Sequence, residues 1–155
     1  MPIREMVRLG GQLVGRAGWA PILVFLLHVF ISRVLNGYIL YPPIDIPMHF
    51  FGGVAMAYFL SASFGALPDG AVRGDLRAIA QFVVVVSLTA TASTFWEFAE
   101  FISDVLFGTL AQLGLEDTLL DMALGIAGGT SFVLMSWRQR GLGLVMPLQA
   151  TGGSE

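Results

Sequence analysis

The chain has 155 residues, of which 55% are hydrophobic and only 12% are charged, and its net charge is -3. Because a soluble domain ordinarily carries about 25% charged residues, this composition excludes a disordered chain, a coiled coil and a soluble enzyme of ordinary surface polarity. The chain has no cysteine, which excludes disulfides, thiolate metal sites and cysteine nucleophiles. The acidic balance and the absence of a Lys/Arg cluster exclude nucleic acid as a partner.

Four apolar stretches are each long enough for a bilayer-spanning helix, which needs about 20 residues. They cover residues 19–41, 49–67, 78–107 and 119–137. Arginines at positions 4, 8 and 16 precede the first stretch among apolar residues, which predicts a short amphipathic surface helix. We therefore predict an all-α, polytopic membrane protein with three parts: an N-terminal segment (1–18), a bundle of four transmembrane helices (19–138) and a C-terminal tail (139–155).

The charges are divided between the two ends of the predicted bundle. Seven of the eight arginines lie before the first stretch, between the second and third, or after the fourth. By the positive-inside tendency, both termini are predicted to face the cytoplasm. The eighth, Arg33, lies within the first stretch. Seven of the eleven acids fall at the opposite, outer end: Asp45, Glu97, Glu100, Asp104, Glu116, Asp117 and Asp121.

The spacing of these acids predicts polar helix faces, because residues three or four positions apart share one face of a helix. Asp45 and His49, Glu97 and Glu100, and Asp117 and Asp121 are such pairs. Acids at this depth are costly in hydrocarbon, so we expect the three faces to meet one another. Asp104 and Glu116 are interpreted as solvated loop charges, and the tryptophans with Tyr38 and Tyr41 as aromatic residues at the membrane boundaries.

On the first stretch, His28, Ser32 and Asn36 recur every four residues, with Arg33 beside them. We predict that Arg33 is the counter-charge of the acid cluster, and that His28, Asn36 and Asp117 also orient a ligand or balance charge. Small residues on the second stretch, and Gly125 with Gly129 on the fourth, predict close helix packing.

Carboxylates together with an imidazole are the ligand set expected for a divalent metal ion: Zn, Mn, Fe, Mg or Ca. Bundle metal sites are built from helix-borne ligands at such spacings. A structural alternative is that Asp45 and Asp117 are helix N-caps and that the other acids pair with Arg33. Glu97 and Glu100 lie near a helix C-terminus, where the dipole disfavours anions, so they need a cation or shared protons, and we favour the cation. The predicted metal ligands are Asp45, His49, Glu97, Glu100 and Asp121.

Three motifs carry a resemblance to a known family: Asp45-x-x-x-His49-Phe50-x-Gly52, Trp96-Glu97-x-x-Glu100, and Asp117-x-x-x-Asp121-Met122 followed by Gly125. In these motifs the chain resembles the YjdF-like family of bacterial inner-membrane proteins and, more distantly, the VanZ-like proteins. His28 followed by Tyr38 is similar to the first-helix pattern of that family. The resemblance covers roughly residues 24–130, and it departs in the loop before Asp117. It implies a small helical protein of the bacterial inner membrane and supplies no reaction.

Three functions fit these observations, and the sequence leaves open whether the protein is an enzyme. The first is a divalent-metal site that faces outward, with metal-assisted hydrolysis or transfer on a lipid-like phosphate as the reaction class. The second is a non-catalytic scaffold or accessory subunit that binds other membrane protein subunits. The third is proton or cation transport, which is less favoured because the cytoplasmic halves of the last three stretches contain no ionisable residue.

Overall fold

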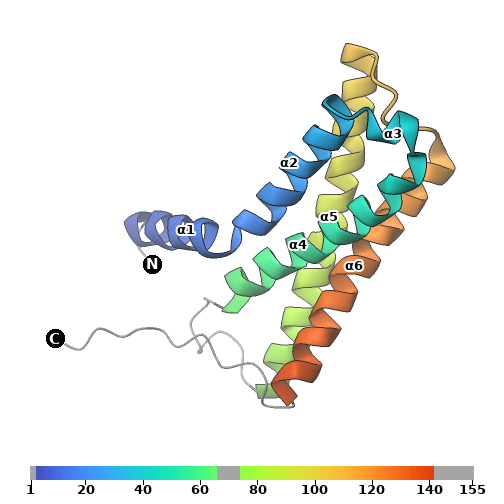
Figure 1. Cartoon of the computed structure of the whole chain (residues 1–155). Helices are drawn as coiled ribbons and strands as arrows, with labels where there is room; N and C mark the ends of the chain where they lie inside the picture. Colours follow the sequence, from blue (N-terminus) through green and yellow to red (C-terminus); the bar gives the residue numbers. More distant parts are fainter. Residues whose placement is uncertain (1–2, 66–73, 142–155) are drawn as a thin grey trace.

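The computed structural model describes residues 3–65 and 74–141, and every regular element within them is helical (Figure 1). Three of the helices, α4, α5 and α6, are each long and apolar enough to cross a membrane. The described elements confirm the predicted all-α membrane fold. They are α1 (Ile3–Ala17), α2 (Trp19–Arg33), α3 (Gly37–Leu40), the 3-10 helix η1 (Pro42–Ile44), α4 (Asp45–Gly65), α5 (Gly74–Phe107) and α6 (Leu115–Gly141).

The fourth possible span is a bent pair of helices. α2 has only 15 residues, about 22 Å of helix, which is shorter than the hydrocarbon thickness of about 30 Å. Gly10–Ala17 of α1 and Trp19–Arg33 together are long and apolar enough to cross, but they meet at an angle of 57°. The arginines of α1, Arg4, Arg8 and Arg16, are exposed. A position of α1 on the membrane surface stays a prediction.

The prediction of one continuous span over residues 19–41 is wrong. α2 ends at Arg33, and Asn36 follows with a φ of 50°, in the left-handed region. Asparagine tolerates this conformation better than most residues, and it redirects the chain into the short helix α3. Asn36 therefore does not share a helix face with His28 and Ser32.

The other boundaries are close to the predicted ones. α5 ends at Phe107 as predicted, whereas α4 and α6 each begin four residues earlier than expected, at Asp45 and Leu115. α5 has 34 residues, about 51 Å of helix, so it extends beyond the hydrocarbon. The predicted turn at Leu67–Gly70 and residues 142–155 of the predicted tail lie outside the described residues.

Glycines allow α4 and α6 to pack closely. A Cβ on Gly53 would lie 1.9 Å from the carbonyl oxygen of Gly125, and one on Gly128 would lie 2.0 Å from that of Phe50. Gly125 faces α5 as well, where an added Cβ would lie 2.2 Å from the Ser93 hydroxyl. The predicted small-residue packing is confirmed, and it brings the backbones of α4 and α6 together just beside His49.

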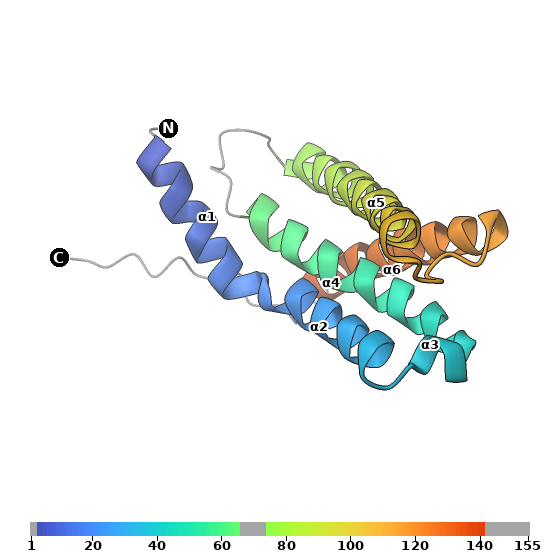
Figure 2. The same cartoon turned by 90° about the horizontal axis from the view of Figure 1, so that it is seen from above.

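The helix directions gather the predicted site residues at one end of the bundle. α2 and α5 end there and α4 and α6 begin there, while α1 and the last turns of α6 lie at the other end (Figures 1 and 2). The seven acids from Asp45 to Asp121 that were predicted to lie at one end are thus separated from the arginines of α1 and from Arg138, as the sequence predicts. The side chains of Arg73, Arg77 and Arg140 lie outside the described residues.

Candidate metal centre

The five predicted metal ligands come from three helices and converge on His49. Asp45 and His49 lie in the first two turns of α4, Glu97 and Glu100 lie in the C-terminal third of α5, and Asp121 lies in the second turn of α6. Glu97 and Asp121 are each only 3% exposed, and Asp45, His49 and Glu100 are partly buried. Residues far apart in the sequence therefore form one buried cluster.

The two ring nitrogens of His49 face different carboxylates. Nε2 lies 3.2 Å from Oδ1 of Asp45 and 3.7 Å from Oδ2 of Asp121. Nδ1 lies 3.8 Å from Oε1 of Glu97. Because the lone pairs of the two nitrogens point in different directions, one ion cannot bind both nitrogens of a single ring.

The structure accordingly divides the predicted ligands into two groups that share His49. The first group is Asp45, His49 and Asp121, and the second is His49, Glu97 and Glu100. Within each group, one ligand atom from each residue lies within 4.8 Å of the others. Two atoms bound to one ion at about 2.1 Å each lie roughly 3 to 4 Å apart, so both groups have dimensions close to those of a coordination sphere.

In the second group, each glutamate has one oxygen held by a neighbouring N–H. Trp96 Nε1 donates to Oε1 of Glu100 at 2.8 Å. Gln112 Nε2 donates to Oε2 of Glu97 at 3.2 Å and to its backbone oxygen at 3.0 Å. The other oxygen of Glu97, Oε1, is buried without a hydrogen-bond partner and is directed toward Nδ1 of His49. A buried, unpaired carboxylate oxygen is costly unless a cation or a proton satisfies it.

Asp104 fixes the loop that carries Gln112, a role that its interpretation as a solvated loop charge did not include. Oδ1 of Asp104 accepts the Ala111 N–H at 2.8 Å, and Oδ2 accepts the Gln112 N–H at 3.0 Å. The Thr109 hydroxyl also donates to Asp104. These bonds connect the end of α5 to the loop before α6 and thereby hold Gln112 over Glu97.

Of the residues predicted to balance charge or orient a ligand, Arg33 and Asn36 do not reach the cluster. Both are exposed, and within residues 3–65 and 74–141 no ion pair joins Arg33 to an acid. The helix that was expected to continue past Arg33 ends there, and the Arg33 side chain is exposed. The predicted counter-charge is thus not supplied by Arg33 in the structure.

Asp117 and His28 lie beside the cluster. Oδ2 of Asp117 accepts the N–H of Leu113 at 3.2 Å, so Asp117 binds a free backbone donor at the start of α6. Nδ1 of His28 lies 2.7 Å from the hydroxyl of Tyr38, and the His28 ring packs edge to face on Trp96 at 4.8 Å. Tyr38 is outside the spanning helices, and burial raises its pKa above the usual range, so its hydroxyl stays protonated.

The alternative that Asp45 is an N-cap does not describe its role here. The chain is already helical at Asp45, which follows η1 directly with φ -64° and ψ -42°. Its carboxylate is within ion-pair distance of His49 instead.

Four carboxylates, those of Asp45, Glu97, Glu100 and Asp121, surround the His49 side chain. A cation or shared protons must offset the repulsion between these carboxylates.

A comparison with family models matches residues 16–141 to the family described as "Predicted membrane protein (DUF2238)". The match includes all five predicted ligands and the loop that carries Gln112. The chain belongs to this family. No curated protein and no solved structure matches the chain.

For this member of the DUF2238 family, the sequence did not predict that Gln112 contacts the site, and it gave Trp96 and Tyr38 only a place in the family motifs and at the membrane boundary. The spacing of Trp96 and Glu100 (i, i+4) was a usable signal, because such residues meet on a helix face. Tyr38 and Gln112 lie outside the long helices, and no sequence periodicity places a loop residue against a helix.

Proposed function

We propose that this membrane protein binds a divalent cation between Nδ1 of His49 and the carboxylates of Glu97 and Glu100. The observation that carries the proposal is the buried Oε1 of Glu97, which has no hydrogen-bond partner and lies 3.8 Å from that nitrogen. Carboxylate oxygens with one imidazole suit Zn²⁺, Mn²⁺ or Fe²⁺ in particular. Two negative side chains at this depth also supply a reason for a cation to bind.

Asp45 and Asp121 have a supporting role in this proposal. With Nδ1 on the ion, Nε2 carries the ring proton and donates it toward Asp45, which lies 3.2 Å away, with Asp121 next to it. A carboxylate on the second nitrogen of a ligating histidine fixes its tautomer and raises its basicity. Trp96 and Gln112 fix the two glutamates in the same way, since each occupies one carboxylate oxygen and leaves the other for the ion.

A cation at this position would act as a Lewis acid on an oxygen of a bound ligand. The reaction class we propose is therefore metal-assisted hydrolysis or transfer on a lipid-like phosphate. We also propose that the YjdF-like resemblance denotes this same family, because its three motifs lie within the matched residues 16–141. That identity would place the protein in the bacterial inner membrane.

Metal content tests the binding proposal. The protein is purified in mild detergent without chelators, and its metals are measured by mass spectrometry. We expect about one divalent ion per chain in the wild type and in the control Glu116→Gln, whose side chain is exposed. We expect the ion to be lost in Glu97→Gln. Negligible metal in all three preparations, also after dialysis against Zn²⁺ and Mn²⁺, would overturn the proposal.

A further inference from the structure

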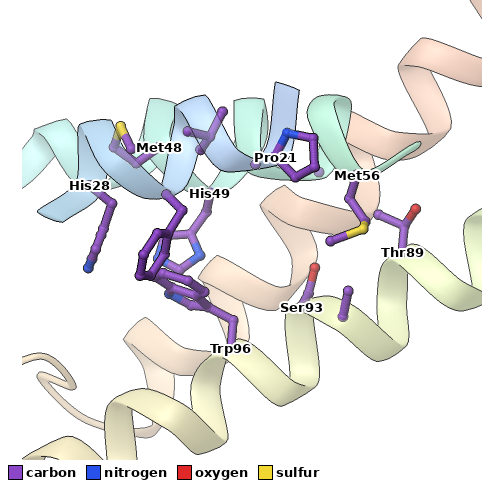
Figure 3. Close-up of a pocket in the computed structure, with 13 residues that line it drawn as sticks. Pro21, His28, Met48, His49, Met56, Thr89, Ser93 and Trp96 are labelled. Carbon is purple, nitrogen blue, oxygen red and sulfur yellow. The ribbon is translucent and has the colours of Figure 1, made fainter. Parts of the chain in front are cut away.

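A cavity of about 130 Å³ lies between α2, α4 and α5, directly beside the candidate metal centre (Figure 3). His49 forms part of its wall. The rest of the wall is mainly apolar and includes Val24 and Phe25 of α2, Gly52 and Met56 of α4, and Ala92 of α5. Apolar cavities of about this size stay dry and accept apolar ligands.

The polarity of the cavity changes along the helix axes. His28, His49 and Trp96 line its outer end, at the level of the carboxylates. About two helical turns further in, roughly 10 Å, Pro21, Met56 and Thr89 line its inner end. The Thr89 hydroxyl donates to the Val85 carbonyl at 2.8 Å, so its proton is already used within α5. The cavity therefore runs from a polar end at the metal centre to an apolar end inside the membrane.

One side of the cavity lies between α2 and α5. α2 and α5 lie on either side of α4 (Figure 2), and the rings of Phe25 and His28 bridge them by packing on Trp96. These ring contacts are at the outer end. Phe25 is 50% exposed, and its neighbours Ile22 and Leu26 are also exposed on α2. Exposed apolar side chains of α2 thus lie beside the cavity.

We propose that this cavity holds a segment of one hydrocarbon chain of a membrane lipid, whose polar end lies at the metal centre. The position of the lipid's polar end rests on the proposed function, whereas the position of its hydrocarbon chain rests on the cavity alone. The volume suits a few methylene groups, so the remainder of the chain stays in the bilayer. The polar-to-apolar order of the cavity parallels that of a lipid, with the headgroup outward and the chain inward.

The test fills the cavity and asks whether a lipid chain still enters it. Ala92→Leu puts a larger side chain into the wall, and Ala127→Leu is the matched control, because Ala127 is exposed on α6. Gly52→Val is a second filling variant, since a Cβ on Gly52 would meet only Val24 Cγ1, at 4.0 Å. It replaces Ala92→Leu if that variant does not elute as a single species.

The probe is phosphatidylglycerol with a photoreactive diazirine in the middle of one acyl chain, in vesicles of phosphatidylethanolamine and phosphatidylglycerol. After illumination, peptide mass spectrometry locates the label. We expect labelled Val24 and Met56 in the wild type and in Ala127→Leu, and at least fivefold less of this label in the filled variant. Equal labelling in the two variants, or label confined to exposed residues such as Phe98 and Leu134, would overturn the proposal.

Metal analysis of the same samples separates this proposal from the proposed function. Full metal content together with no label at Val24 and Met56 overturns the lipid site and leaves metal binding intact. Label at these residues that is sensitive to Ala92→Leu, in a protein without metal, supports the chain site and overturns metal binding only.

Discussion

Oε1 of Glu97 lies 3.8 Å from Nδ1 of His49, buried and without a hydrogen bond, while its partner oxygen Oε2 accepts a hydrogen bond from Gln112. The distance is too long for a hydrogen bond and close to the separation of two ligands on one ion. This pair therefore marks the position of the proposed cation, and it decides which nitrogen of His49 would bind it.

The two carboxylate groups around His49 should respond differently to substitution. Glu97→Gln removes a direct ligand and should weaken metal binding more than about 100-fold. Asp121→Asn leaves Asp45, 3.2 Å from Nε2, as the acceptor of the Nε2–H and should weaken binding less than about tenfold. Competition with a fluorescent chelator measures both affinities. The opposite order would place the ion on the Nε2 side, with Asp45 and Asp121.

Gln112 should be a positioning residue for Glu97. Gln112→Leu removes both of its hydrogen bonds to Glu97 and should weaken metal binding about 10- to 100-fold, because loss of a group that orients a ligand typically has this cost. The matched control is Gln139→Leu, at an exposed position near the end of α6. Unchanged metal affinity in Gln112→Leu, measured with the same chelator assay, would contradict a positioning role of Gln112.

Trp96 should support Glu100 through its indole N–H. Trp96→Phe keeps an aromatic ring but loses the donor to Oε1 of Glu100, so metal affinity should fall about 10- to 100-fold. Trp19→Phe is the control, since Trp19 is exposed and lies at the start of α2. Isothermal titration of both proteins with Mn²⁺ makes the comparison, and equal affinities would contradict it.

The close contact of α4 and α6 should make Gly53 intolerant of a methyl group. Its Cβ would lie 1.9 Å from the Gly125 oxygen, so Gly53→Ala forces the helices apart and should cost about 1–3 kcal/mol of unfolding free energy. Gly52→Ala is the neighbouring control, because its Cβ would meet only Val24 Cγ1 at 4.0 Å. Thermal unfolding in detergent, followed by circular dichroism, should show a lower Tm for Gly53→Ala alone.

The sequence predicted the helical fold and the gathering of the acids because both follow from local pattern. Apolar length indicates the spans, and the spacing of Asp45 and His49 puts them on one helix face. Helix direction then brings those faces to one end. The length of the first apolar stretch did not predict where its helix ends. α2 ends at Arg33, and the left-handed conformation of Asn36 redirects the chain, so Arg33 does not reach the acids.

The sequence could not predict that the carboxylates form two groups, one beside each ring nitrogen of His49. Spacing places a histidine on a face but does not say which ring nitrogen meets which carboxylate, because that depends on the rotation and separation of three helices. The contact of Gln112 with Glu97 depends in turn on a loop shaped by Asp104. Loop conformation of this kind has no periodic signal.

Pulsed electron paramagnetic resonance of the Mn²⁺-loaded protein tests the central claim most directly, because it detects a nitrogen bound to the metal. The chain has only two histidines, His28 and His49, so the source of a ¹⁴N coupling can be assigned with two variants. We predict a coupling from one imidazole nitrogen in the wild type that persists in His28→Gln and is absent in His49→Gln. A wild-type spectrum without ¹⁴N coupling, or a coupling that survives in His49→Gln, would contradict it.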